Sequence, residues 1–204
     1  MNQRANKDTA EHLAKNALFS AAVSLFAEKG YASTSVREIV ALAGVTKPVL
    51  YYYFESKEGL FRAILDWAAE QQQILLTTVL DTPGTALQRM IRLYGLIQEG
   101  VIENGNLFKL IHNLVFGPPQ GAPAYDVEQY HRRMVEAIKL IYLKGLDQGE
   151  VIEADPDEVA MLLLGLTDFC FHLYHVNPES FDPAQPERLL RLAFRGLSDG
   201  NGGS

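Results

Sequence analysis

The sequence predicts an all-α protein, and the spacing of its apolar residues is the main reason. Such residues recur three and four positions apart along almost the whole chain, as they do on the buried side of a helix. Residues that begin and end helices stand between these runs, and no run alternates as a half-buried strand does. With 204 residues, of which 48% are apolar, the chain is long enough to bury one substantial core or two small ones.

Two helices are predicted in the first 44 residues. The first carries one apolar stripe from Ala14 onward and ends at "EKG", where Gly30 suits a left-handed cap. The second begins after Ser35, which stands three residues before Glu38. This spacing is typical of a capping box, in which each side chain bonds a free backbone amide of the other residue. The second helix is short and ends at Gly44.

The remaining helices follow from the same signals. Thr46 is the predicted cap of a third helix, with Pro48 in its first turn, and Ser56 opens a fourth. The turn "DTPG", residues 81–84, is the clearest break between the N-terminal part and the rest. Further helices are predicted at 85–103, 105–116, 124–148, 156–175 and 186–197.

The third helix carries the most unusual residues, in the stretch "GVTKPVLYYYFESKEGLF". Two short helices joined by a tight turn match the helix-turn-helix arrangement, whose second short helix enters the major groove of DNA. Four rings cannot all point inward. We expect Tyr51 and Tyr52 to face outward, where they would offer hydroxyls to phosphates and ring faces to a sugar or a thymine methyl. The predicted core residues of this helix are Leu50, Tyr53 and Phe54.

Charge and composition narrow the classes of function. The net charge is −7, but residues 1–60 hold seven bases against six acids, a balance of +1, and the other 144 residues carry −8. This asymmetry fits a DNA-contacting head on an acidic body, and it fits many enzymes equally well. No glycine-rich phosphate loop, nucleophile elbow or paired-carboxylate motif is present, so an enzyme is the weaker class.

Metal, membrane and secreted classes are also disfavoured. Cys170 is the single cysteine, and the favoured interpretation is a small buried hydrophobe. His172 and His175 lie three apart with Asp168 nearby, a spacing that metal ligands use, but no third ligand is close in sequence. We therefore expect no metal and no cofactor. Without an apolar stretch of about eighteen residues or a secretion signal, we expect a cytoplasmic protein that binds no membrane.

Residues 17–61, "ALFSAAVSLFAEKGYASTSVREIVALAGVTKPVLYYYFESKEGLF", resemble the DNA-binding domain of the TetR family of bacterial transcriptional repressors. The resemblance implies an all-helical homodimer whose heads bind a partly palindromic DNA operator and whose bodies pair through their last two long helices. It also implies a small-molecule effector held inside the body. The predicted domains are a helix-turn-helix DNA-binding domain, 1–60, and a helical effector-binding and dimerisation domain, 61–204. The resulting hypothesis is a ligand-responsive repressor; the alternative is a helical small-molecule-binding or enzymatic protein without DNA binding.

The resemblance also implies roles for individual residues. Pro48 stands where many members of the family have glycine, and it removes one backbone amide from possible DNA contact. Residues expected to touch phosphates or an outer base are Thr34, Ser35 and Arg37. Residues expected in the base-reading turn are Thr46, Lys47, Pro48 and Val49. Residues expected to grip the DNA backbone are Tyr51, Tyr52 and Lys57.

Aromatic and histidine residues of the body are the candidates for effector contact. Aromatic residues at helical spacing are more often core than pocket, and a buried histidine is more often satisfied by the protein itself. His112 and His172 stand in apolar runs, where a polar atom needs a partner. The candidates are Trp67, Tyr94, Phe108, His112, Phe116, Tyr142, Phe169 and His172, with Phe171 and Tyr174 in the same runs.

The stretch "VAMLLLGLTDFCFHLY" is apolar around most of its helical circumference. Burial against a partner subunit would remove that surface from water, which supports the homodimer. A central helix of a single subunit is the alternative explanation.

Overall fold

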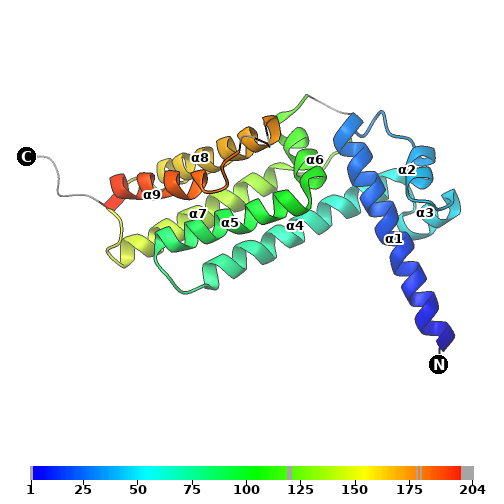
Figure 1. Ribbon diagram of the computed structural model, residues 1–204, viewed down its shortest axis with the longest axis horizontal. Coiled ribbons are helices and arrows are strands. Elements are labelled where there is room, and N and C mark those ends of the chain that lie inside the picture. The colour runs from blue at the N-terminus through cyan, green and yellow to red at the C-terminus, as the bar shows by residue number, and fades with distance from the viewer. Residues whose placement is uncertain (1, 119–120, 178, 180, 199–204) are drawn as a thin grey trace, which may run out of the picture. The chain divides into compact units, whose positions relative to one another are not determined.

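The computed structural model describes the backbone of residues 2–118, 121–177, 179 and 181–198, and the side chains of these residues except 2–11, 175, 176 and 198. Within this part of the chain there are nine α-helices and no strand, which confirms the predicted all-α class (Figure 1). The helices are α1 (Asn2–Lys29), α2 (Val36–Leu42), α3 (Lys47–Phe54), α4 (Lys57–Asp81), α5 (Ala86–Glu103), α6 (Gly105–Phe116), α7 (Glu128–Asp147), α8 (Pro156–Val176) and α9 (Gln185–Ser198).

Two helices begin elsewhere than the sequence pattern indicates. Helix α1 begins at Asn2, twelve residues before the apolar stripe starts at Ala14. Helix α7 begins at Glu128 and not near residue 124. Residues 124–127 before α7 are not helical, and the Tyr125 hydroxyl there donates a hydrogen bond of 2.9 Å to the Asp66 carboxylate.

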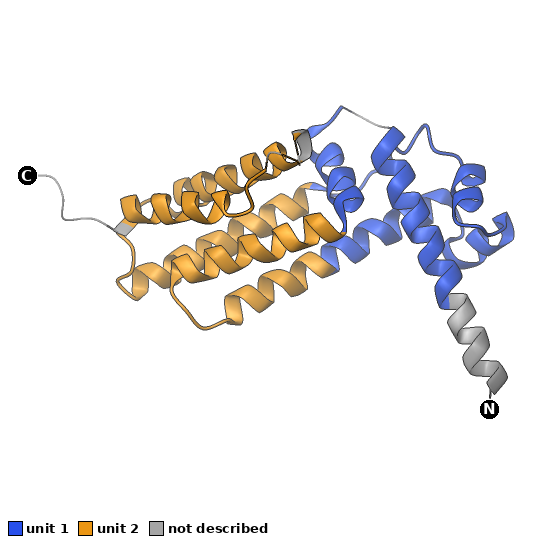
Figure 2. Cartoon of the chain, viewed as in Figure 1, with its two compact units in different colours: residues 1–70, 104–127 blue, residues 71–103, 128–204 orange. Residues whose placement is uncertain are grey.

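The chain forms two compact units (Figure 2). Unit 1 contains residues 1–70 and 104–127, and unit 2 contains residues 71–103 and 128–204. Helix α4 is shared between them, so the sequence-based boundary after residue 60 lies within its first turns. Helix α6, which the sequence places in the body, belongs to unit 1.

The core of unit 1 surrounds α1, which packs against α2, α3 and α6. Phe26 of α1 makes an edge contact with Phe61 of α4, with the ring centroids 5.6 Å apart. On another side of α1, the Asn106 amide of α6 donates a hydrogen bond to the Ser24 hydroxyl, at 3.1 Å. The fully buried side chains of this core include Leu18, Ala22, Phe26, Ile39, Leu50, Leu60, Phe61 and Leu110.

Gly59 lets α4 begin directly against the end of α3. A Cβ atom added at this position would lie 2.0 Å from the Phe54 carbonyl oxygen, a distance that no side chain tolerates. The Ser56 hydroxyl accepts the Gly59 N–H at 2.9 Å and caps the new helix. The local sequence thus fixes the direction in which α4 leaves the end of α3.

Unit 2 is a helical bundle in which α7 packs against α8, and α5 packs against α7 and α9. Its fully buried side chains include Met90, Ile138, Ile141, Tyr142, Leu163 and Leu190. Gly145 of α7 lies where a Cβ atom would approach the Ala86 methyl group to 2.7 Å, so glycine allows α5 and α7 to come close.

Candidate nucleic-acid interface

The turn between α2 and α3 is held by backbone hydrogen bonds that only a left-handed residue permits. Gly44 has φ +67°, its N–H donates to Ala41 O, and the Val45 N–H donates to Val40 O at 3.0 Å. This pattern is a Schellman motif, which ends a helix and reverses the chain direction. Ile39 and Leu50 are fully buried on the facing sides of α2 and α3, so the two helices share one small core.

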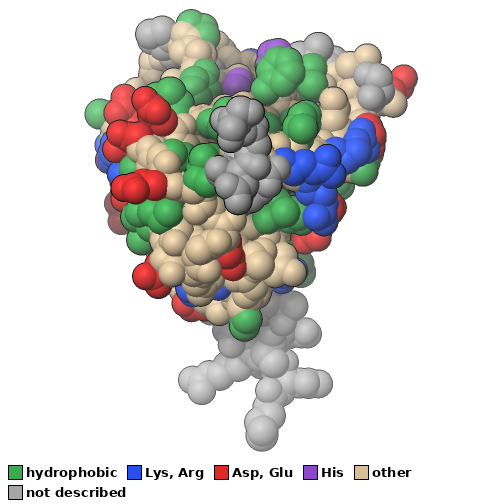
Figure 3. All heavy atoms as spheres, turned by 90° about the vertical axis from the view of Figure 1, so that its left-hand side faces the viewer, with side chains coloured by type: hydrophobic (Ala, Val, Ile, Leu, Met, Phe, Trp, Pro, Cys, Tyr) green, Lys and Arg blue, Asp and Glu red, His purple; other side chains and the backbone are tan. Residues whose placement is uncertain are grey.

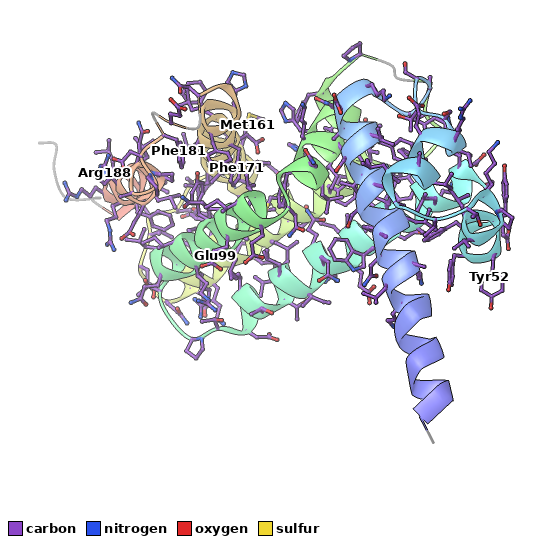
Figure 4. The ribbon with its side chains drawn as sticks, turned by 45° about the vertical axis from the view of Figure 1, so that its right-hand side comes forward. Tyr52, Glu99, Met161, Phe171, Phe181 and Arg188 are labelled. Carbon is purple, nitrogen blue, oxygen red and sulfur yellow. The ribbon has the colours of Figure 1, made fainter. Side chains whose placement is uncertain are left out.

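The face of α3 that points away from this core is aromatic and carries one cation. Tyr51 is 49% exposed and Tyr52 is 74% exposed, as predicted, while Leu50 and Phe54 are buried. Figure 4 shows the Tyr52 side chain projecting outward from α3. The remaining exposed residues of this face are Thr46, Lys47 and Pro48, with Val49 half-buried.

Tyr53 lies between the buried core and the exposed face of α3. It is half-buried, its ring meets the Tyr52 ring edge-on with centroids 5.0 Å apart, and it lies 6.3 Å from the Phe54 ring. The prediction that Tyr53 is a core residue is therefore only partly confirmed. One side of its ring contacts the exposed Tyr52.

Thr46 is the N-cap of α3, but its hydroxyl makes no capping bond in this structure. Pro48 occupies the first turn, where its missing N–H would have had no partner within the helix. The exposed Thr46 hydroxyl and Lys47 ammonium therefore stand together at the start of α3, where the helix dipole favours an anion.

The start of α2 forms the predicted capping box. The Ser35 hydroxyl accepts the Glu38 N–H, while the Glu38 carboxylate accepts the Ser35 N–H at 2.8 Å. Lys29 donates to the same carboxylate, and bonds from Lys29 and then from Ser35 lower the pKa of Glu38 to about 2. Arg37 follows the cap and is exposed. The Ser35 hydroxyl thus has a structural role in the free protein, and its contact with DNA stays a prediction.

Thr34 is buried at the end of α1. Its side chain is 1% exposed, and its hydroxyl donates to the Gly30 carbonyl at 2.8 Å. The Thr34 hydroxyl is thus used within the protein, and a contact of this residue with DNA stays a prediction. The sequence showed a hydroxyl beside a cap, and the structure uses that hydroxyl to close the end of α1.

Lys57 also has partners within the protein. Its ammonium donates hydrogen bonds to the Tyr31 and Thr34 carbonyls and lies 3.9 Å from the centroid of the Tyr31 ring. Residue spacing does not indicate these partners, because they lie 26 and 23 residues away along the chain.

The predicted effector residues are divided between the two units. Trp67 (edge-on to Phe19), Phe108, His112 and Phe116 lie in unit 1, and Tyr94, Tyr142, Phe169 and His172 lie in unit 2. In unit 2, one groove is lined by residues of α4 and α7, including Leu76 and Leu140, and a second hollow lies between Ala86 and Arg195. None of the eight residues lines either of these two hollows.

Tyr142 has a structural role in unit 2, and its contact with an effector stays a prediction. It is 1% exposed, and its hydroxyl accepts the Ala154 N–H at 2.7 Å and lies 2.9 Å from the Ile152 carbonyl oxygen. These bonds hold the α7–α8 connection and leave the hydroxyl no free surface for a ligand.

Tyr94, one of the predicted effector residues, has a buried hydroxyl without a well-formed hydrogen bond to any described residue. It is 3% exposed and its ring stacks on Phe171, with centroids 5.3 Å apart and planes 5° apart. The hydroxyl is buried beside the Cys170 thiol and makes no hydrogen bond of good geometry within the described residues. Burial, and secondarily Cys170, raises the pKa of Tyr94. Cys170 itself is buried, as predicted.

Among the described residues there is neither a candidate metal cluster nor a candidate membrane-spanning helix. Among the side chains that are described, no three His, Cys, Asp or Glu residues are grouped so that they could hold a metal ion. The His175 side chain, one of the pair singled out by spacing, lies outside the described residues. No helix in the described ranges has both the length and the apolar character that a membrane crossing requires.

The geometry of α2 and α3 defines a helix-turn-helix unit within an all-α chain. Comparison with known proteins agrees, because residues 18–64 match the family described as "Bacterial regulatory proteins, tetR family". This segment belongs to that family, which confirms the resemblance predicted from the sequence.

The whole chain also has similar relatives. It is 32% identical over 196 residues to "Uncharacterized HTH-type transcriptional regulator YuxN" of Bacillus subtilis (strain 168), a match that covers 90% of this chain and 64% of that protein. The chain thus spans slightly less than two thirds of that relative. That relative is described as a transcriptional regulator and the matched family as regulatory proteins, in agreement with the predicted class.

Two solved structures show the same fold over both units. A Clostridium perfringens putative fatty acid metabolism regulator superposes with a TM-score of 0.72 at 23% identity, covering 92% of this chain and 100% of that one. A gamma-butyrolactone receptor (ArpA-like protein) superposes with a TM-score of 0.68 at 25% identity, covering 92% and 97%. The N-terminal helix-turn-helix and the helical C-terminal part are therefore the architecture of TetR-type regulators.

Proposed function

We propose that this chain is a ligand-responsive transcriptional repressor of the TetR type, which binds a palindromic operator in the cytoplasm as a homodimer and leaves it when a small molecule binds. The observation that carries the proposal is the outer face of α3. There Lys47, Tyr51 and Tyr52 are exposed on a helix that α2 supports from behind. Exposing two adjacent tyrosine rings to water is unfavourable. The same rings and hydroxyls can contact the sugars and phosphates of a DNA backbone.

A homodimer is supported by the outer face of α8. Met161 is 76% exposed, Leu162 is 53% exposed and Phe169 is 60% exposed, although the opposite face of α8 is buried in unit 2. Exposed Gly165 lies between them and allows close approach of a second helix. Figure 3 shows one surface view, in which hydrophobic side chains lie among basic and acidic ones. We propose that α8, together with α9, pairs with the same helices of a second copy.

An effector contact is supported by Tyr94. A buried hydroxyl without a partner is costly, and a ligand carrying a hydrogen-bond acceptor would satisfy it. A γ-butyrolactone carries such a carbonyl, and one similar structure is that of a γ-butyrolactone receptor, so this compound class is the first probe. Effector binding must make the free energy of DNA binding less favourable by about 1 to 3 kcal/mol, the usual coupling free energy between two sites of one protein.

The test begins with selection of bound duplexes from a random DNA pool, followed by fluorescence anisotropy on the selected duplex. Binding should weaken steeply with salt, because each neutralised phosphate releases counterions. Tyr51→Ala/Tyr52→Ala should abolish the binding. The matched control is Phe116→Ala, which removes an equally exposed ring of unit 1 outside α2 and α3.

The outcomes separate the two classes of function. Salt-dependent binding that requires Tyr51 and Tyr52, and that is unaffected by Phe116→Ala, supports the repressor. Absent or salt-insensitive binding supports the alternative, a helical protein that binds a small molecule and not DNA. For the effector, Tyr94→Phe should reduce the release of DNA by a lactone probe and leave DNA binding itself unchanged.

A further inference from the structure

The connection between α1 and α2, residues 30–35 and hereafter the α1–α2 loop, is tied to the first residue of α4. The Lys57 ammonium donates to the Tyr31 carbonyl at 2.9 Å and to the Thr34 carbonyl at 2.8 Å. It also lies over the Tyr31 ring, 3.9 Å from the centroid, within the range of a cation–π contact. One side chain thus makes three contacts with a loop more than twenty residues away.

The ammonium is partly removed from water by these contacts. Burial lowers the pKa of Lys57, which is the direction expected when a charged amine loses hydration. An ammonium has three N–H donors, and two of them are used by the loop carbonyls. Lys47 differs, because its side chain is exposed at the start of α3.

The α1–α2 loop is also held from its other side. The Tyr31 ring packs against Phe26 of α1 and Phe61 of α4, with centroids 5.4 and 5.0 Å away. The Thr34 hydroxyl closes the end of α1, and its carbonyl, which Lys57 holds, directly precedes the Ser35 cap of α2. The position of the α2 N-terminus therefore depends on Lys57.

We infer that Lys57 is a positioning residue: it fixes the start of α2 relative to α4 for DNA binding and does not bind a phosphate. This inference rests on the proposed DNA-binding function. A shift of Lys57 to a phosphate would leave two loop carbonyls without their donor, and it would free the Tyr31 ring from its cation. Two of the three N–H donors of Lys57 and one face of the Tyr31 ring are already engaged in the free protein.

The experiment compares Lys57→Met with Lys47→Met, two variants that keep a long apolar stem and lose one charge. DNA affinity is measured by fluorescence anisotropy on a duplex selected from a random pool, from about 50 to about 200 mM salt. A lost phosphate contact reduces the slope of log affinity against log salt by about 0.9, so by about 1.8 in a dimer. We expect this reduction for Lys47→Met. For Lys57→Met we expect weaker binding by the same factor at every salt concentration, with the slope unchanged.

Hydrogen exchange in the free protein gives a second measurement that does not depend on DNA. Lys57→Met should increase amide exchange across residues 31–39, and Lys47→Met should not. If Lys57→Met does not fold, Tyr31→Leu replaces it, because this variant removes the ring under the ammonium and leaves the lysine free to reach a phosphate. The positioning role predicts weaker binding and faster exchange for Tyr31→Leu as well.

Three results would overturn the inference: a smaller salt slope for Lys57→Met, unchanged DNA affinity, or unchanged exchange of the α1–α2 loop. Failure of the proposed function looks different, because then the wild-type protein selects no duplex. Hydrogen exchange would still decide in that case whether Lys57 holds the loop.

Discussion

The exposed face of α8 gives a quantitative prediction for the proposed homodimer. Burying a whole Phe or Met side chain contributes about 1.5 to 3 kcal/mol. Phe169 is 60% exposed and Met161 is 76% exposed, so covering the exposed part of each contributes about 1 to 2 kcal/mol. Each residue occurs twice in a two-fold dimer. Phe169→Ala/Met161→Ala should therefore cost about 4 kcal/mol or more of association free energy, a rise in Kd of roughly a thousand-fold.

Sedimentation velocity over a series of protein concentrations is the assay. The double variant should sediment as a monomer at concentrations where the wild-type protein is a dimer, with unchanged helical content by circular dichroism. Ile74→Ala is the matched control, since Ile74 is 54% exposed on α4 and away from α8. Identical sedimentation of wild type and double variant would refute the assignment of this face to the dimer.

Two further predictions concern stability. The pKa of Glu38 is lowered from 4.5 to about 2 in the folded protein. Its carboxylate therefore contributes fully to folding stability above the unfolded pKa, and this contribution is lost as the pH falls toward the folded pKa. The midpoint temperature of thermal unfolding should therefore fall less between about pH 5 and pH 2 for Glu38→Gln than for wild type. An equal fall in the two proteins would contradict this. Tyr142→Phe leaves the Ala154 N–H without its acceptor and should cost about 1 to 2 kcal/mol in urea unfolding. Wild-type stability of that variant would contradict the structural role of the Tyr142 hydroxyl.

The sequence predicted those features of the DNA-binding unit that depend on local chemistry. The Ser35–Glu38 capping box, the glycine at the turn and the burial of Leu50 and Phe54 all follow from spacing along one or two helical turns. Such interactions are determined by residues three or four apart, and a single sequence contains that information in full.

The sequence does not reveal the partners of polar groups that bond distant backbone atoms. Lys57 and Tyr142 present an ammonium and a hydroxyl that sequence reasoning offers to a ligand. In the structure each one bonds backbone carbonyls or amides of a loop. Helix periodicity shows which face of a helix is polar, but it carries no information on which backbone groups that face will meet.

The interruption of unit 1 along the chain limits how this protein can be re-engineered. A chimera that joins residues 1–70 to the C-terminal part of another regulator would bring α1 without α6, the helix whose Asn106 bonds Ser24 and whose Leu110 is fully buried. The uncovered side of α1 would then meet a foreign helix of different shape. Grafts that carry residues 104–127 along with the head should keep their operator preference, and those that omit them should express poorly.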